Sequence, residues 1–266
     1  MKILRTPESA FDNIKDFPFK ENYHTTSDGL RVHYLDEGNP DHPIVLLLHG
    51  EPSWSFLYRT MIPILVAGGM RVIAPDLVGF GKSDKPAAQS DYTYAKHIKW
   101  MQEVVDHLEL KNINMFIQDW GGLIGLRLLT ANPDNFATVV AANTMLPTGS
   151  VTPPQAFLDW QNFVATSPKF DVATVLQMAT TTTLSEDIIT AYNAPFPTEE
   201  HKAGARVFPA LVPTTEKDPE SDNNKKAWGI LTQWSKPFLC LFSDQDPITK
   251  GGDQVFQKLV PGTEGQ

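Results

Sequence analysis

Five short apolar runs, each ending at a polar residue or a proline, constrain the fold of this chain more than any other feature. They cover residues 44–48, 71–74, 113–117, 137–142 and 237–242. Continuous runs of this length are typical of strands buried on both faces, as in a parallel sheet covered by helices. Helical patterns lie between them, at 98–108 and 123–129. This alternation predicts an α/β fold with a mostly parallel central sheet and helices on both faces.

The strand-like runs stop after Pro147, where the composition also changes. The chain then becomes rich in Thr, Pro, Asn and charged residues, and only helical patterns occur, at 156–164 and 172–178. We therefore predict a helical cap inserted into the core. The predicted units are a first core segment 1–147, the cap 148–226 and a second core segment 227–266. Within the cap, the very polar stretch 214–226 is expected to be a surface loop.

Composition excludes several classes of protein. Of the 266 residues, 41% are hydrophobic and 20% charged, which is too apolar for a disordered chain. The formal net charge of −9 repels phosphate backbones, so we expect no nucleic-acid partner. The single cysteine, Cys240, favours a reducing compartment. Residues 1–20 lack a signal-peptide pattern and no apolar run is long enough to cross a bilayer, so we predict a cytoplasmic protein without a membrane partner.

The most informative stretch is 114–122, where the third run leads into a turn and a helix. Asp119 occupies the turn, followed by Trp120-Gly121-Gly122. The pattern resembles the turn that lifts the nucleophile above the sheet in α/β-hydrolases, with Asp in place of the usual Ser. A carboxylate at a helix N-terminus is also a common cap, which is the alternative interpretation. As a nucleophile, Asp119 would attack a saturated carbon and form an alkyl ester, which water must then hydrolyse.

A second motif follows the first run, at 49–54 (His-Gly-Glu-Pro-Ser-Trp). In the same fold this loop supplies one backbone N–H to an oxyanion hole, and the residue after the nucleophile supplies another. Those residues would be Glu51 and Trp120. A third motif, 76–86, follows the second run and is expected to be a structural loop.

Together these motifs resemble those of the haloalkane dehalogenases, over nearly the whole chain from Arg31 to Pro261. The glutamate at Glu51 resembles the branch with Glu in the oxyanion loop and two halide-binding tryptophans. The resemblance implies an α/β-hydrolase fold with a helical cap. It implies hydrolysis of a small halogenated alkane to an alcohol, a halide ion and a proton, without a cofactor or metal. The sequence carries no indication of the oligomeric state.

The resemblance also implies roles for individual residues. Asp119 matches the nucleophile and Trp120 the first halide-binding tryptophan, whose indole N–H is a donor only. Trp160, in the cap, is the best match for the second, and its alternative is an aromatic of the cap core. Glu51 is expected to position the hydrolytic water. Trp228 and Trp234 are expected to be structural.

The remaining triad members are the acid and the base. Asp246 fits the family's spacing for the acid, and Asp244 is the alternative. The base should be a histidine after the last strand, yet no histidine follows His201. We therefore expect the last strand and helix of the fold to be missing from this sequence. A polypeptide of these 266 residues should alkylate itself at most once.

Two other functions remain open from the sequence. An epoxide hydrolase uses the same Asp nucleophile but needs cap tyrosines, and the predicted cap holds only Tyr192. A catalytically incomplete binding protein on the same fold is kept open by the missing histidine.

Overall fold

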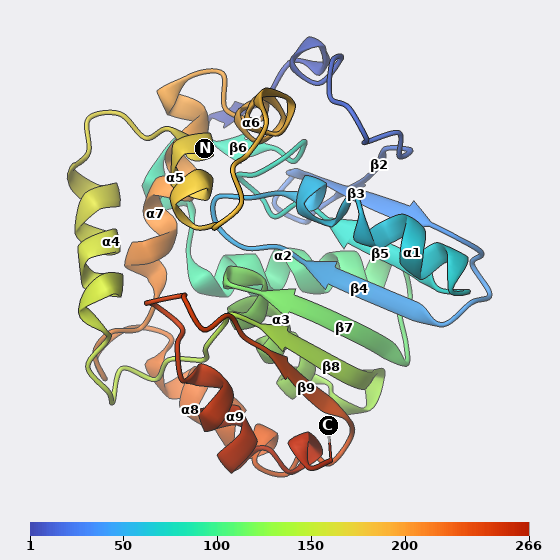
Figure 1. The fold of residues 1–266 in the computed structure, drawn as a ribbon, viewed down its shortest axis with the longest axis vertical. Coiled ribbons are helices and arrows are strands. Elements are labelled where there is room, and N and C mark those ends of the chain that lie inside the picture. Colours follow the sequence, from blue (N-terminus) through green and yellow to red (C-terminus); the bar gives the residue numbers. More distant parts are fainter. Residues whose placement is uncertain (266) are drawn as a thin grey trace.

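A computed structural model describes residues 1–265 and contains a seven-stranded sheet (Figure 1). In spatial order its strands are β2 (Asn22–Thr25), β3 (Arg31–Glu37), β5 (Arg71–Pro75), β4 (Ile44–Leu48), β7 (Ile113–Gln118), β8 (Phe136–Ala142) and β9 (Phe238–Leu241). The five strands from β5 to β9 are parallel. β3 pairs antiparallel with β5 and β2 pairs antiparallel with β3, so β3 alone runs opposite to the other six strands. All five predicted strands are therefore confirmed, as is the α/β class. β1 (Ile3–Leu4) and β6 (Lys85–Pro86) form a separate two-stranded sheet.

The sequence did not reveal β2 and β3. β3 is interrupted by polar residues, so it contains no continuous apolar run. His33 in its centre is nevertheless fully buried, because its ring pairs with the Asp76 carboxylate at 2.7 Å. Burial of a polar residue requires such a partner, which hydrophobic patterning cannot reveal.

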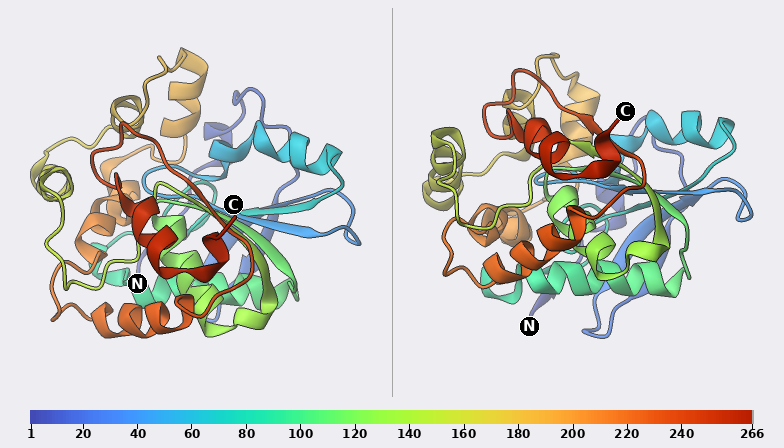
Figure 2. Two further views of the ribbon diagram at one scale, coloured as in Figure 1. Left: turned by 60° about the horizontal axis from the view of Figure 1, so that its bottom comes forward. Right: turned by 90° about the horizontal axis from the view of Figure 1, so that it is seen from below.

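Helices cover the sheet on both faces, as predicted. On one face lie α2 (Tyr94–His107), α3 (Trp120–Ala131) and α8 (Ser221–Leu231), and α1 (Met61–Ala67) lies on the other (Figure 2). α9 (Gly252–Leu259) follows the edge strand β9 and packs against it. Short 3₁₀ helices occur at Glu8–Ala10, Ser55–Tyr58 (η2), Gln89–Asp91, Pro133–Asn135, Glu199–Lys202 and Pro261–Thr263.

The segment between β8 and β9 contains helices and loops only. Four of its helices lie beyond the carboxyl ends of the parallel strands (Figure 1): α4 (Gln155–Thr166), α5 (Val172–Met178), α6 (Glu186–Asn193) and α7 (Ala203–Leu211). The segment also includes α8, which lies on the sheet. The expected surface loop 214–226 is wrong in its second half, because α8 begins at Ser221 and packs against α3. We propose that the cap ends before α8 and that the core resumes there.

Close packing of α3 on the sheet depends on small residues. A Cβ on Gly121 would lie 1.9 Å from the Leu48 carbonyl oxygen, and one on Gly125 would lie 2.6 Å from Ile117 Cγ2. Contacts this short are not tolerated, so glycine sets the distance between α3 and strands β4 and β7. That distance in turn fixes the residue at the start of α3, Asp119, against the loop that follows β4.

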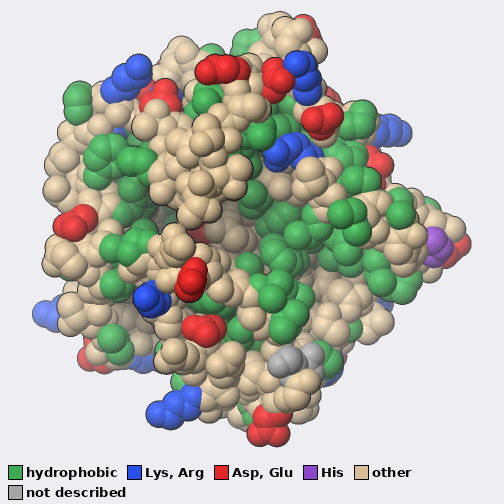
Figure 3. Space-filling view, viewed as in Figure 1, with side chains coloured by type: hydrophobic (Ala, Val, Ile, Leu, Met, Phe, Trp, Pro, Cys, Tyr) green, Lys and Arg blue, Asp and Glu red, His purple; other side chains and the backbone are tan. Residues whose placement is uncertain are grey.

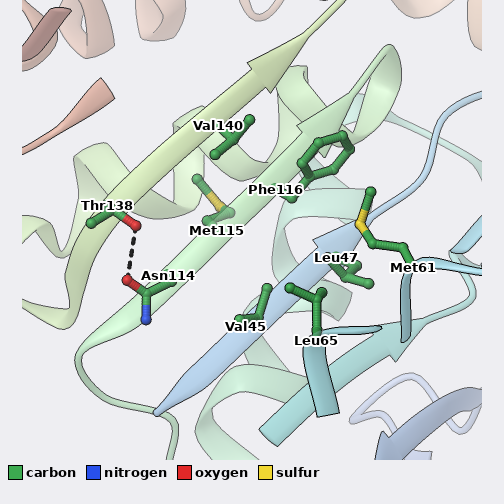
Figure 4. A pocket seen from close by; sticks show the side chains of 9 residues that line it. All are labelled: Val45, Leu47, Met61, Leu65, Asn114, Met115, Phe116, Thr138 and Val140. Carbon is green, nitrogen blue, oxygen red and sulfur yellow. Dashed lines mark hydrogen bonds between the residues drawn. The ribbon is translucent and has the colours of Figure 1, made fainter. Parts of the chain in front are cut away.

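The opposite face of the sheet is open between α1 and α9 (Figures 1 and 3). A shallow, largely apolar depression there is lined by Val45, Leu47, Met61, Leu65, Asn114, Met115, Phe116, Thr138 and Val140 (Figure 4). Most of these residues belong to the middle of β4, β7 and β8, away from the carboxyl ends of the strands. Within residues 1–265 no strand follows β9, and no helix in that range is both long and apolar enough to span a bilayer.

Candidate active site

Asp119 occupies the sharp turn between β7 and α3. Its backbone has φ 51° and ψ −124°, a conformation that L-residues adopt only when their surroundings enforce it. Its N–H donates to the Asn143 carbonyl at 3.2 Å, and its own carbonyl accepts from Thr144 Oγ1 at 2.7 Å. Although Asp119 stands at the N-cap position, its side chain makes no capping hydrogen bond with the second or third residue of α3. The geometry therefore supports a nucleophile more than a helix cap.

The carboxylate of Asp119 faces the loop after β4. Glu51 N donates to Asp119 Oδ1 at 2.7 Å, and the backbone N–H of Trp120 also hydrogen-bonds this carboxylate. Gly50 makes the approach possible, because a Cβ there would lie 2.3 Å from Asp119 Oδ1. The two N–H groups predicted to form an oxyanion hole thus both bind the Asp119 carboxylate, and the Glu51 N–H binds its Oδ1.

Two carboxyl groups share this buried space. Burial raises the pKa of the Asp119 carboxyl to about 6. The hydrogen bonds from the Trp120 and Glu51 N–H groups oppose this rise, whereas the negative charge of Asp246 adds to it. Burial, and then the charge of Asp119, raise the pKa of Glu51 well above its usual range. Glu51 Oε1 is buried and has no hydrogen-bond partner among the described residues. Asp119 is therefore ionised at neutral pH, whereas burial and the charge of Asp119 both disfavour ionisation of Glu51.

A buried polar network supports the loop after β4. The His49 ring donates from Nδ1 to the Gly50 carbonyl at 2.9 Å, and its Nε2 accepts from Leu77 N at 2.9 Å. Both ring nitrogens are used, so His49 is structural, as expected. Its Nε2 contact joins this loop to the one that follows β5.

Asp76, in the loop after β5, joins the network from the other side. Its carboxylate accepts from Ser55 N at 2.7 Å, from Lys82 N at 2.8 Å and from His33 Nδ1 at 2.7 Å. Sequence reasoning assigned this loop a structural role but missed the pairing with His33. A carboxylate directly after a buried strand marks Asp76 as a candidate, but no sequence pattern identifies His33 as its partner.

Asp246 lies on the loop after β9. Burial would raise the pKa of its carboxyl, but hydrogen bonds from the Thr249 hydroxyl, the Asn143 amide and the backbone N–H groups of Ile248 and Thr249 hold it below its usual range. Its charge also acts on the pKa of Asp119. Asp244 is exposed and accepts no hydrogen bond among the described residues. The surroundings therefore favour Asp246 over Asp244 as the acid.

Three of the four tryptophans considered above, Trp120, Trp160 and Trp228, have different surroundings. Trp120 is buried, and its ring lies 4.4 Å from that of Phe208 on α7. The aromatic contacts of Trp160 on α4 are with Phe163, at 5.8 Å between ring centroids, and Phe170, at 6.1 Å. Within residues 1–265 the structure does not bring the rings of Trp120 and Trp160 into contact. Trp228 uses its indole N–H, which donates to the Leu146 carbonyl at 2.8 Å.

No histidine among residues 1–265 hydrogen-bonds Asp119 or Asp246. His97 lies near the site, because its buried ring lies 4.5 Å from the ring of Phe208, which in turn packs on Trp120. Burial lowers the pKa of His97 to about 3, with smaller contributions from His49 and Lys96. Over the same residues, no three His, Cys, Asp or Glu side chains gather as metal ligands.

The strained turn after β7, the N–H groups facing it and the parallel sheet define an α/β hydrolase. A family model of the alpha/beta hydrolase fold matches residues 43–263. A haloalkane dehalogenase from Psychrobacter cryohalolentis is 58% identical over 270 residues, which cover 100% of this chain and 89% of that protein. One from Mycolicibacterium paratuberculosis is 46% identical, covering 100% of this chain and 90% of its own length.

A solved structure agrees with these sequence matches. Haloalkane dehalogenase DpaA from Paraglaciecola agarilytica NO2, described as tetrameric, superposes with a TM-score of 0.94 at 34% identity, covering 98% of this chain and 89% of that one. The chain belongs to the haloalkane dehalogenases.

Proposed function

We propose that this protein hydrolyses a small halogenated alkane through an alkyl ester on Asp119. The observation that carries the proposal is the 2.7 Å hydrogen bond from Glu51 N to Asp119 Oδ1. In ester hydrolysis the attacked carbon is Asp119 Cγ itself, so negative charge develops on an oxygen of Asp119. Donors aimed at that oxygen stabilise the charge.

The first step needs only groups of this site. The oxygen of Asp119 that does not receive the Glu51 N–H attacks the carbon bearing the halogen. A C–O bond forms, and the C–halogen bond breaks with its electron pair leaving on the halide. A carboxylate with a pKa of about 6 is ionised at neutral pH and needs no base for this attack. The indole N–H of Trp120 is free to donate to the departing halide, and we propose Trp160 as a second donor.

The second step returns Asp119 and forms the alcohol. Water attacks Asp119 Cγ, and we propose that the unpartnered Glu51 Oε1 holds this water while the Glu51 and Trp120 N–H groups receive the developing charge. Asp246 would stabilise the protonated form of a histidine base. Because no described histidine hydrogen-bonds either aspartate, we expect a polypeptide of residues 1–266 alone to stop at the ester.

Intact-mass spectrometry of a polypeptide of residues 1–266 after exposure to 1-bromobutane tests this proposal. We expect one butyl group per chain on Asp119, located by peptide mapping, together with release of one equivalent of bromide. Asp119→Asn should abolish both, whereas Asp244→Asn, an exposed carboxylate nearby, should change neither. A folded protein that is not alkylated would contradict the Asp119 nucleophile, and sustained bromide release would contradict the arrest at the ester.

A further inference from the structure

Asn143, directly after β8, contacts both carboxylate-bearing segments of the site. Its carbonyl accepts from Asp119 N at 3.2 Å. Its side-chain Nδ2 donates to Asp246 Oδ2 at 2.9 Å and to Thr249 Oγ1 at 3.2 Å, while its Oδ1 accepts from Ser243 N at 3.2 Å. One side chain therefore holds both ends of the loop that carries Asp246.

The next residue completes the attachment to the nucleophile. Thr144 Oγ1 donates to the Asp119 carbonyl at 2.7 Å, so Asn143 and Thr144 together bind the backbone N–H and carbonyl of Asp119. The turn at Asp119 is strained, with φ 51°, and needs surroundings that enforce it. The same two-residue segment thus fixes the nucleophile and the acid relative to each other.

The chemistry of asparagine suits this position in two ways. Asn143 has φ 41°, in the left-handed region that asparagine tolerates better than most residues. Its amide offers two donors and an acceptor without adding charge, and the structure uses all three functions. A carboxylate in its place would repel Asp246, and an apolar side chain would leave Ser243 N and Asp246 Oδ2 each without one partner.

We propose that Asn143 is a positioning residue of the dehalogenation site, whose amide fixes the Asp246 loop against the Asp119 turn. The role of this bridge in dehalogenation rests on the proposed function, whereas the existence of the bridge does not depend on that function. Removal of the amide takes one donor from Asp246, so the carboxylate becomes easier to protonate. The charge of Asp246 acts on Asp119 across the bridge and raises the pKa of the Asp119 carboxyl.

Two substitutions distinguish the effect of losing the Asn143 amide from the effect of disturbing its backbone conformation. Asn143→Gly removes the amide but keeps easy access to positive φ, whereas Asn143→Ala removes the amide and disfavours that φ. The readout is the pKa of the Asp246 carboxyl, measured by NMR in protein with ¹³C-labelled aspartate and without any haloalkane. We expect both variants to raise this pKa by about one unit, as loss of a hydrogen bond to a charged group implies. An unchanged pKa in Asn143→Gly would overturn the proposal.

Asn114 provides a matched control at the opposite end of β7. Its Nδ2 donates to the Ile44 carbonyl at 3.0 Å and its Oδ1 accepts from Thr138 Oγ1 at 2.8 Å, so it too bridges neighbouring strands (Figure 4). Asn114→Gly should lower stability and leave the Asp246 pKa unchanged. An equal shift in this variant would show general loosening and contradict a specific role for Asn143.

A measurement on the unsubstituted protein keeps the test independent of variant folding. The side-chain N–H protons of Asn143 should change chemical shift with the same midpoint as the Asp246 carboxyl, and an unresponsive amide would overturn the bridge. Because no substrate is present, a protein that shows the bridge but is not alkylated would contradict the proposed function alone.

Discussion

Indole N–H groups in this protein differ in whether the fold already uses them. Trp228 donates to the Leu146 carbonyl, whereas within residues 1–265 Trp120 and Trp160 have no protein acceptor. We expect Trp120→Phe and Trp160→Phe each to weaken bromide binding about tenfold, since a lost hydrogen bond to an ion costs about 1.5–3 kcal/mol. Calorimetric titration with bromide measures this. Trp228→Phe is the control and should bind bromide as tightly as the unsubstituted protein. If Trp160→Phe also binds bromide that tightly, Trp160 belongs to the cap core and not to the halide site.

The charge of Asp246 acts on the nucleophile and gives a pH prediction. Attack requires ionised Asp119, whose pKa is about 6, so the rate of alkylation should fall as the pH drops through about 6. Asp246→Asn removes a negative charge that raises this pKa, and the midpoint should therefore move to lower pH. The rate of butyl transfer at several pH values, followed by intact mass, measures the shift. Asp244→Asn should not move the midpoint, and an unmoved midpoint in Asp246→Asn would show that the two carboxylates do not interact.

The two loops after β4 and β5 depend on one buried carboxylate. Asp76 accepts from Ser55 N, Lys82 N and His33 Nδ1, and burial of such a group is tolerated only with these partners. In Asp76→Asn the new amide N–H₂ group faces at least one of these three N–H donors and cannot accept from it. We therefore expect a loss of about 3 kcal/mol in the free energy of unfolding. Urea denaturation measures it. Asp36→Asn breaks a partly exposed ion pair with Arg71 and should cost at most about 1 kcal/mol in the free energy of unfolding. If Asp76→Asn and Asp36→Asn lose similar amounts of stability, Asp76 has no special role.

These loops also show how much of the structure the sequence could predict. The parallel strands follow from their apolar runs, and the carboxyl ends of neighbouring parallel strands meet at one edge, so Glu51 and Asp119 could be placed together from sequence. Polar bridges such as His33–Asp76 and Asn143–Asp246 could not. They join residues far apart in sequence through single hydrogen bonds, and no periodicity marks a residue whose partner lies on another loop.

The stability of the molecule as a whole should depend on pH through a buried histidine. His97 is 1% exposed among Tyr92, Trp100 and Phe208, and burial lowers its pKa from an ordinary value of about 6.5 to about 3. Between these values the unfolded chain binds a proton that the folded chain excludes. The contribution of His97 to stability is therefore complete above about pH 6.5 and is lost as the pH falls, by up to about 1.4 kcal/mol per pH unit.

Other groups act in the same pH range, so the slope of the wild-type curve cannot be assigned to His97 without a variant. Asp119 works against it, because its folded pKa of about 6 lies above the unfolded value, and folding then takes up a proton as the pH falls. His97→Phe fills the same aromatic cluster without a titrating group, so its unfolding free energy should fall less steeply between pH 6.5 and 4. His42→Asn, at an exposed position, should keep the wild-type slope. Urea denaturation of the three proteins across this pH range decides the matter: parallel curves for His97→Phe and wild type would mean that His97 can be protonated without unfolding.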